Sequence, residues 1–400
     1  MEVGSYQNFI AKKDYAVMVL FLSLCGNVFV NSITSYIYVF VAFCFLFKYI
    51  SNPNVQSLVT PSLKSGVITI ISCFIVLFVL QYFVFDWNTV PGLINHISKF
   101  IVGAGVVAYF GVRFRLVLFK TMYVLCFVSL PLWLYQFVTG SGVGGFDWAL
   151  GKTIIVYCYR ASADIVRNCG FFWEPGAMGG YIAFTFLLFL YDFGDLLKSY
   201  KKECVVLFLT LLSTQSSAAY IDFGLFVIVY VMFSMKSKAK FWLLPVVVVS
   251  ALYVYNSAGF LSKKIKDQNE KASEMTIGEF SSTRTGTIMF DLHYIQKHPL
   301  IGNGLHERTR LADHDYIRKM LKSGDMAAMG NGLSDQLAKW GFTYFFVFCL
   351  VFFKSNPTLP LDKKIYFLLL VAVMLQGECF LNYPLFLSIP LIRIKDGDVL

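Results

Sequence analysis

A charged and glycine-bearing stretch, Arg167 to Gly176, stands directly before a long apolar run and holds the side chains best suited to chemistry. Glu174 precedes Pro175, a residue that suits the first position of a helix, so Glu174 is expected at the N-cap. The positive end of the helix dipole there favours a charged carboxylate. Such a group is a good hydrogen-bond acceptor and a candidate general base, and Gly176 lets a ligand approach the backbone closely. The competing interpretation is a capped helix start with an interfacial belt of aromatic residues.

Arginines and a histidine outside the apolar runs are the candidate partners of Glu174. Guanidinium groups match phosphate oxygens bidentately, so Arg167, Arg284 and, more weakly, Arg160 are candidate ligands of an anionic substrate. The competing interpretations are snorkelling at a membrane surface for Arg167 and a solvated loop for Arg284. His298 precedes a proline and can act as a base, although a histidine packed in a turn is the favoured interpretation.

The histidines and cysteines show no metal-ligand spacing, so neither a metal nor a cofactor is expected. Most cysteines lie in apolar runs and are expected to be small core residues. Cys158 and Cys169 share a segment outside these runs. The sequence leaves two interpretations open for them, a disulfide and two free thiols. Asp222 and Glu378 lie inside apolar runs, where a carboxylate is costly and is expected to face a polar interior.

The composition identifies the chain as an integral membrane protein. Of its 400 residues 57% are hydrophobic and only 14% are charged, whereas a soluble domain carries about a quarter charged residues. The net charge of +10 is spread in short clusters between apolar runs, a pattern that orients a membrane protein and argues against a nucleic-acid partner. No cleavable signal peptide is expected.

Apolar runs of about bilayer length predict an all-α polytopic membrane protein with about twelve transmembrane helices. Basic residues concentrate in alternate loops, which predicts cytoplasmic N- and C-termini and places the two longest polar segments on the other side. The predicted spans are 15–30, 33–50, 67–85, 94–112, 114–138, 177–193, 203–215, 217–235, 241–257, 337–354, 365–382 and 383–393.

These runs divide the chain into five regions. In the large loop late in the chain, a helix is expected after Ser281 or Ser282 that ends before His298-Pro299, followed by a turn at Gly302-Asn303-Gly304. A further helix is expected at 316–322. The regions are N-terminal transmembrane helices (1–138), a first external loop (139–176), central transmembrane helices (177–257), a large external loop (258–336), and C-terminal transmembrane helices with a cytoplasmic tail (337–400).

An ordered set of motifs in the second half of the chain resembles the O-antigen polymerase and ligase family, whereas the first half matches it only as a hydrophobic scaffold. Two positions depart from the family. Gly330 stands before Asn331 where ligases typically have a histidine, and Ser217 stands where many relatives have an arginine. The motifs are R-x-x-G-x-x-x-E-P-G from Arg167 to Gly176, Thr214-Gln215-Ser216, Arg284-Thr285-Gly286, His298 to Gly304, and Gly330-Asn331-Gly332-Leu333 before Gly341.

The resemblance implies an inverting, metal-independent glycosyltransferase of the GT-C type in the bacterial inner membrane, with its active site on the periplasmic face. It would be a polysaccharide polymerase that transfers a growing glycan from undecaprenyl diphosphate to a sugar hydroxyl of the next lipid-linked repeat unit. The implied roles are catalytic for Glu174 and His298, diphosphate-binding for Arg167, Arg284 and Arg160, and supporting for Gly176, Ser216 and Asn331.

The resemblance also implies the partners and leaves two alternative functions open. The partners would be the undecaprenyl-diphosphate-linked oligosaccharide donor and acceptor, membrane lipid, and in the same pathway a chain-length regulator and a flippase. One alternative is a ligase that passes the glycan to lipid A core, which the glycine at position 330 disfavours. The other is a flippase or exporter of lipid-linked oligosaccharide, which would place its cations on spans near the membrane midplane.

Overall fold

The computed structural model describes residues 10–27, 30, 33–85, 89–140, 146–148, 152–154, 157–162, 165–235, 284–306, 308–311 and 331–394. Helices make up most of this part of the chain. The elements up to the first external loop are α1 (Lys12–Ser23), α2 (Thr34–Ser51), α3 (Pro53–Leu58), α4 (Pro61–Tyr82), α5 (Val90–Phe110), η2 (Gly111–Arg113) and α6 (Phe114–Thr139).

The elements that follow begin with four strands and end with short helical turns. They are β1 (Phe146–Trp148), β2 (Lys152–Ile154), β3 (Tyr157–Ser162), β4 (Ile165–Gly170), α7 (Pro175–Leu187), α8 (Phe193–Ser199), α9 (Lys201–Ser213), α10 (Ser217–Val229), η3 (Tyr230–Ser234), α13 (Arg284–Lys297), α14 (Arg308–Leu311), α16 (Gly332–Ser355), α17 (Leu361–Gly377), η4 (Phe380–Asn382), α18 (Pro384–Leu387) and η5 (Ile389–Leu391).

Five helical segments of the described chain are long and apolar enough to cross a membrane, as in a multi-pass membrane protein. The longest contains α5, η2 and α6, and it turns at Gly111, whose φ is 52°. The five are Thr34–Ser51, Pro61–Tyr82, Val90–Thr139, Ser217–Ser234 and Gly332–Ser355.

The prediction of about twelve transmembrane helices exceeds what the described residues contain. The runs expected at 15–30, 177–193 and 203–215 form α1, α7 and α9, with 12, 13 and 13 residues, whereas a span needs about 20. Every residue of α7 is buried inside the bundle. Hydropathy does not separate a helix covered by protein from one covered by lipid, which is why α7 looked like a span, whereas α1 and α9 are partly exposed and fall short of a span in length. The run 241–257 lies outside the described residues.

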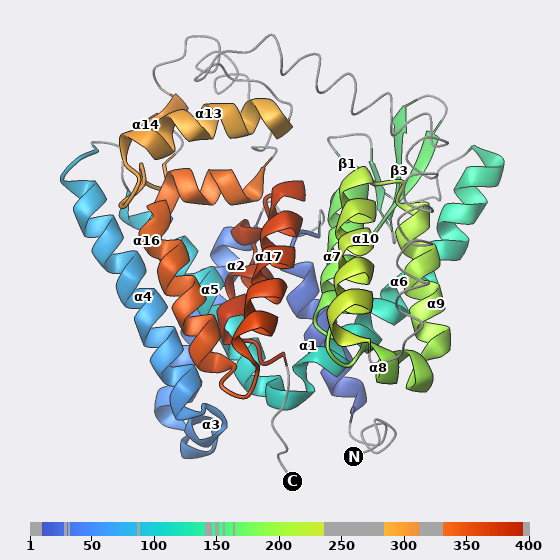
Figure 1. The fold of residues 1–400 in the computed structure, drawn as a ribbon, viewed down its shortest axis with the longest axis horizontal. Coiled ribbons are helices and arrows are strands. Elements are labelled where there is room, and N and C mark those ends of the chain that lie inside the picture. The colour runs from blue at the N-terminus through green and yellow to red at the C-terminus, as the bar shows by residue number, and fades with distance from the viewer. Residues whose placement is uncertain are drawn as a thin grey trace.

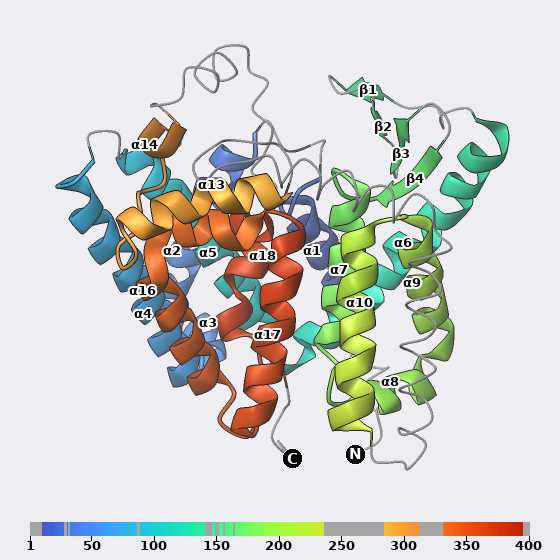
Figure 2. The same cartoon turned by 45° about the horizontal axis from the view of Figure 1, so that its top comes forward.

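The helices form two neighbouring groups (Figure 1). One group contains α2, α4, α5, α16 and α17, and the other contains α6, α7, α9 and α10. α10 packs against both α7 and α17, which joins the groups. α13, α14 and the strands lie at one end, which we call the upper end, and α3 and α8 lie at the opposite, lower end (Figures 1 and 2).

A four-stranded antiparallel sheet, in the order β1-β2-β3-β4, occupies part of the segment that was expected to be a loop. Arg167 of β4 pairs with Tyr159 of β3. The Trp133 indole of α6 donates a hydrogen bond to the Val166 carbonyl (3.0 Å), which fixes β4 on the helix bundle. Strands of three to six residues give too short an alternation to be distinguished from a polar loop by sequence.

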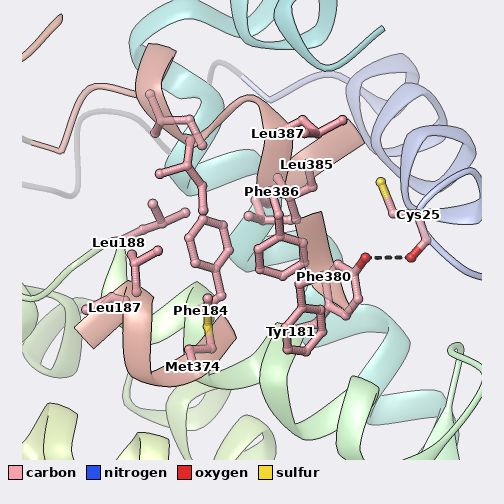
Figure 3. Packing of buried hydrophobic residues seen from close by; sticks show 14 of the residues in the cluster. Cys25, Tyr181, Phe184, Leu187, Leu188, Met374, Phe380, Leu385, Phe386 and Leu387 are labelled. Carbon is pink, nitrogen blue, oxygen red and sulfur yellow. Dashed lines mark hydrogen bonds between the residues drawn. The ribbon is translucent and has the colours of Figure 1, made fainter. Parts of the chain in front are cut away.

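A buried aromatic core fixes α7 in the centre of the molecule (Figure 3). The Tyr181 hydroxyl of α7 donates to the Cys25 carbonyl after α1 (2.5 Å), and the Phe172 ring stacks on Tyr181 at 3.9 Å. Phe386 lies 5.1 Å from Tyr181 and 4.4 Å from Phe380, measured between ring centroids. The middle of α7 is therefore held between the segment after α1 and the segment after α17.

The turn predicted after α13 fills a break in α16. α13 ends at Lys297, as the following His298-Pro299 pair predicted, and α16 is interrupted at Gly341, whose φ is 68°. The Phe342 amide donates to the Pro299 carbonyl (2.8 Å), and the Asn303 amide donates to the Ala338 carbonyl (2.8 Å). Backbone groups freed by the break are thus bonded to another segment. The caps expected at 281–282 and the helix expected at 316–322 lie outside the described residues.

Candidate functional site

The stretch from Arg167 to Gly176 runs from β4 into α7 at the upper end. The Arg167 guanidinium donates from Nε to the Thr214 carbonyl (3.1 Å) and from Nη2 to the Gln215 carbonyl (3.0 Å). These carbonyls follow α9, where Gln215 adopts the left-handed conformation with φ 48°. Arg167 therefore fixes the turn between α9 and α10 and places its positive charge there.

The N-terminus of α7 has the predicted N-cap residue, but a different carboxylate lies against its first turn. Glu174 is the N-cap and Pro175 follows it, yet the Glu174 side chain makes no hydrogen bond to the first turn. The carboxylate of Glu378 lies against that turn instead, because a Cβ atom on Gly176 would collide with its Oε1. Gly176 permits this approach, and the positive end of the α7 dipole stabilises the negative charge of Glu378.

Two carboxylates and a phenol converge at this point. Tyr383 lies within electrostatic range of both Glu174 and Glu378, and its ring packs on Trp173 with the centroids 4.8 Å apart. The start of α16 also touches this place, since a Cβ atom on Gly332 would collide with the Glu378 carbonyl. We call Glu174, Glu378 and Tyr383 the carboxylate site. Its groups can accept a proton from a hydroxyl and orient that hydroxyl.

A buried ionic network ties α13 and α14 to α16. The Arg310 guanidinium binds Asp291 through Nη1 (2.9 Å) and Asp335 through Nη2 (2.8 Å), and all three side chains are at most 1% exposed. Lys339 binds the second oxygen of Asp335 (2.6 Å), and the Ser334 hydroxyl donates to Asp291 (2.6 Å). Two acids and two bases balance in charge and are mutually hydrogen-bonded, the condition under which buried charges are tolerated.

The ionic network lies beside the carboxylate site. Asp335 and Lys339 are within electrostatic range of Cys379, the residue that follows Glu378. Burial raises the pKa of the Asp291 carboxyl to about 7, against the opposing effect of the Arg310 guanidinium. A carboxyl whose pKa is raised by burial beside a specific charge partner is typical of functional sites as well as of structural ion networks.

Lys99 of α5 is a cation near this network that the sequence analysis missed. Its Nζ lies 5.4 Å from the centroid of the Tyr38 ring, and it is within electrostatic range of Lys339. Among the described residues, Lys99 forms no salt bridge. The signal was present in the sequence, because Lys99 interrupts the apolar run 94–112 and a charge inside a span is a functional-site hypothesis by default.

His298 lies at the end of α13, packed against another element. Its ring meets the Phe85 ring edge-on, with centroids 5.0 Å apart. Burial and the neighbouring Lys297 ammonium lower the pKa of the His298 imidazole. His298 is therefore packed against an aromatic ring beside the turn that follows α13.

Asn331 and Ser216 are helix N-caps. The Asn331 side-chain oxygen accepts from the amides of Leu333 (3.1 Å) and Ser334 (2.9 Å) at the start of α16. The Ser216 hydroxyl accepts from the Ala219 amide (3.5 Å) at the start of α10. Both side chains thereby support the helices that surround the carboxylate site.

The remaining predicted residues lie in the strands and at the start of α13. Arg160 of β3 pairs with Val166, and Arg284 is the first residue of α13, but the side chains of both lie outside the described ones. The Cys169 side chain is buried, and the Cys158 side chain is not among those described. Within the described ranges no three His, Cys, Asp or Glu side chains gather as a metal site.

The fold and the site together define a multi-pass membrane protein with a charged, partly buried site at one end of its helices. Comparison with protein-family models finds no family that matches this chain, and comparison with curated proteins finds no matching relative.

Proposed function

We propose that this chain is a membrane glycosyltransferase of the GT-C type, a polymerase that extends polysaccharides on undecaprenyl diphosphate. The single observation that carries the proposal is the convergence of Glu174 and Glu378 at the N-terminus of α7. The ordered motifs of the second half of the chain support the same function, and they include this stretch. In this proposal the upper end faces the periplasm of a bacterial inner membrane.

The two carboxylates have different roles in the proposed reaction. Glu378 lies at the positive end of α7, which keeps it charged, so it orients the acceptor hydroxyl. Glu174 makes no capping hydrogen bond and removes the hydroxyl proton. The hydroxyl oxygen bonds to the anomeric carbon while the bond from that carbon to the diphosphate oxygen breaks. The glycan is transferred with inversion, and the diphosphate leaves with the electron pair.

Cations at the upper end stabilise the departing diphosphate. Arg167, held by two carbonyls, and Arg284, at the start of α13, are the proposed ligands at this end. Fixed positive charge where negative charge develops is the largest contribution in many group transfers. Neither a metal nor a cofactor has a part in this step.

The test is polymerisation by the purified full chain with synthetic undecaprenyl-diphosphate-linked repeat units. Glu174→Gln is expected to lower the rate about 100-fold or more, the usual contribution of a general base. Arg167→Ala and Arg284→Ala are expected to lower it as well. Asp195→Asn is the matched control, since this exposed acid lies on α8 at the lower end. Polymerisation at the wild-type rate by Glu174→Gln would refute the assigned role.

Product analysis separates the proposal from its two rivals. A ladder of glycan lengths on the polyprenyl carrier requires a polymerase. A single glycan transferred to lipid A core indicates the ligase. Counterflow of the lipid-linked sugar in liposomes with no new glycosidic bond indicates a flippase or exporter.

A further inference from the structure

Two adjoining hollows open beside the start of α4 at the lower end, away from the carboxylate site. The first faces the turn from α5 to α6 and the segment at η5, and the second lies between α4 and α16. Their volumes are about 110 and 160 Å³, and Ser62 lines both. Arg393, just after η5, borders the first, and Lys354, near the end of α16, borders the second. We call the pair the lower hollow.

The lining of the lower hollow is mostly apolar, but it also holds two cations and several hydroxyl groups. Neither Lys354 nor Arg393 forms a salt bridge with another described residue, and no Asp or Glu is among the described residues that line the hollow. Unpaired cations beside hydroxyl groups are the chemistry that binds phosphate oxygens. The hydroxyl groups in the lining are those of Thr60, Ser62, Ser65, Thr69 and Ser355.

Exposed apolar side chains continue from the hollow along both helices. On α16, Phe346 and Leu350 are 65% and 40% exposed and precede Lys354 at intervals of four, so the three share one face. On α4, Val76 and Leu80 are 56% and 45% exposed, and Val76 follows the lining residue Thr69 by two helical turns. A hollow that holds two cations and several hydroxyl groups thus adjoins two apolar rows on helices of membrane-spanning length.

We propose that the lower hollow binds the phosphate headgroup of one anionic phospholipid, whose acyl chains lie along these two rows. The hollow holds a phosphodiester, and the rows offer the apolar contact that acyl chains need. A zwitterionic headgroup carries an ammonium group that Lys354 and Arg393 repel, so an anionic lipid is preferred. This site is independent of the proposed polymerase activity.

The experiment titrates the purified full chain, in one detergent, with phosphatidylglycerol or phosphatidylcholine that carries the same fluorescent acyl chain. Phosphatidylglycerol is expected to bind at about one molecule per chain and roughly tenfold more tightly. The double variant Lys354→Gln and Arg393→Gln is expected to remove this preference. Lys64→Gln is the control, because Lys64 is an exposed lysine of α4 that lines neither hollow.

A second variant tests the cavity rather than its charge. Ser62→Trp fills the position shared by the two hollows without changing any charge, and it is expected to weaken phosphatidylglycerol binding. Equal affinity for the two lipids, an equal loss in Lys64→Gln, or unchanged binding by Ser62→Trp would each overturn the proposal. Displacement of the lipid by millimolar inorganic phosphate would show a site for free anions and overturn it as well.

Discussion

Gly176 matters at the scale of single residues because its missing side chain admits the Glu378 carboxylate to the first turn of α7. Gly176→Ala is expected to displace that carboxylate and lower polymerisation about tenfold or more, since misplacement of a positioning group by about 1 Å can cost as much as 100-fold. Gly224→Ala is the control, because a Cβ atom on Gly224 meets no atom within 4 Å. Equal rates for the two variants in the polymerisation assay would show that the position of Glu378 is unimportant.

Asp291 predicts a pH-dependent stability. Its pKa is higher in the folded chain, about 7, than in the unfolded chain, about 4. Such a carboxyl adds stability that is fully present below the unfolded pKa and is lost as the pH rises through the folded pKa. The unfolding midpoint of the wild type, measured relative to Asp291→Asn in detergent, is therefore expected to fall by a few degrees between pH 5 and pH 9.

The control for this pH prediction is an exposed acid, Asp195. Asp195 is 65% exposed at its side chain and pairs only with a neighbour on α8 among the described residues. The difference between the wild type and Asp195→Asn is expected to stay constant over the same pH range. A constant difference for Asp291→Asn as well would contradict the raised pKa.

The break in α16 shows how one element positions another. Gln81 of α4 donates to the Ile301 carbonyl (2.6 Å) in the turn after α13 and to the Lys339 carbonyl (2.8 Å) just before the break. Three segments are therefore joined at one place. Lys339 pairs with Asp335 (2.6 Å) one helical turn away, in the part of α16 that precedes the break, so this side of the ionic network lies beside the break.

Gly341 is the residue that the break requires. Its φ of 68° is unfavourable for residues with a side chain, and a Cβ atom there would collide with the Leu300 carbonyl. Gly341→Ala is expected to lower the stability by about 2 kcal/mol or more. Thermal unfolding in detergent measures this, with Gly224→Ala as the reference. An unchanged midpoint for Gly341→Ala would mean that α16 can run straight.

At the scale of the whole molecule, charged groups gather at two opposite ends. The lower end carries ion pairs between helices, whereas the ionic network and the carboxylate site lie at the upper end. A membrane around the five long apolar helices would place these ends on opposite sides. The lower ion pairs are Arg113 with Asp14 (3.0 Å), Arg115 with Asp192 (3.1 Å) and Lys120 with Glu203 (2.6 Å).

Two cysteine substitutions test this sidedness. Gln296 of α13 and Lys198 of α8 are exposed side chains at the upper and lower ends. A membrane-impermeant maleimide is expected to label Gln296→Cys in intact spheroplasts and Lys198→Cys only after permeabilisation, with the wild type as the background for native cysteines. Labelling of both from the same side would contradict the proposed orientation.

The sequence by itself determined the class of the protein and several local boundaries. A chain this apolar cannot expose its helices to water, so the membrane class follows from composition. The start of α7 after Glu174 and the end of α13 before His298 depend on the neighbouring prolines, whose backbone constraints act locally. The turn after α13 was predicted for the same reason, from its glycines.

Only the tertiary structure decided which charges meet. Glu378 rather than Glu174 lies against the first turn of α7, and Arg310 joins acids from two other helices. The number of long apolar helices was also decided by packing, because α7 is covered by protein on every side. These outcomes depend on contacts between segments far apart in the chain, which hydropathy, helix caps and turn residues do not encode.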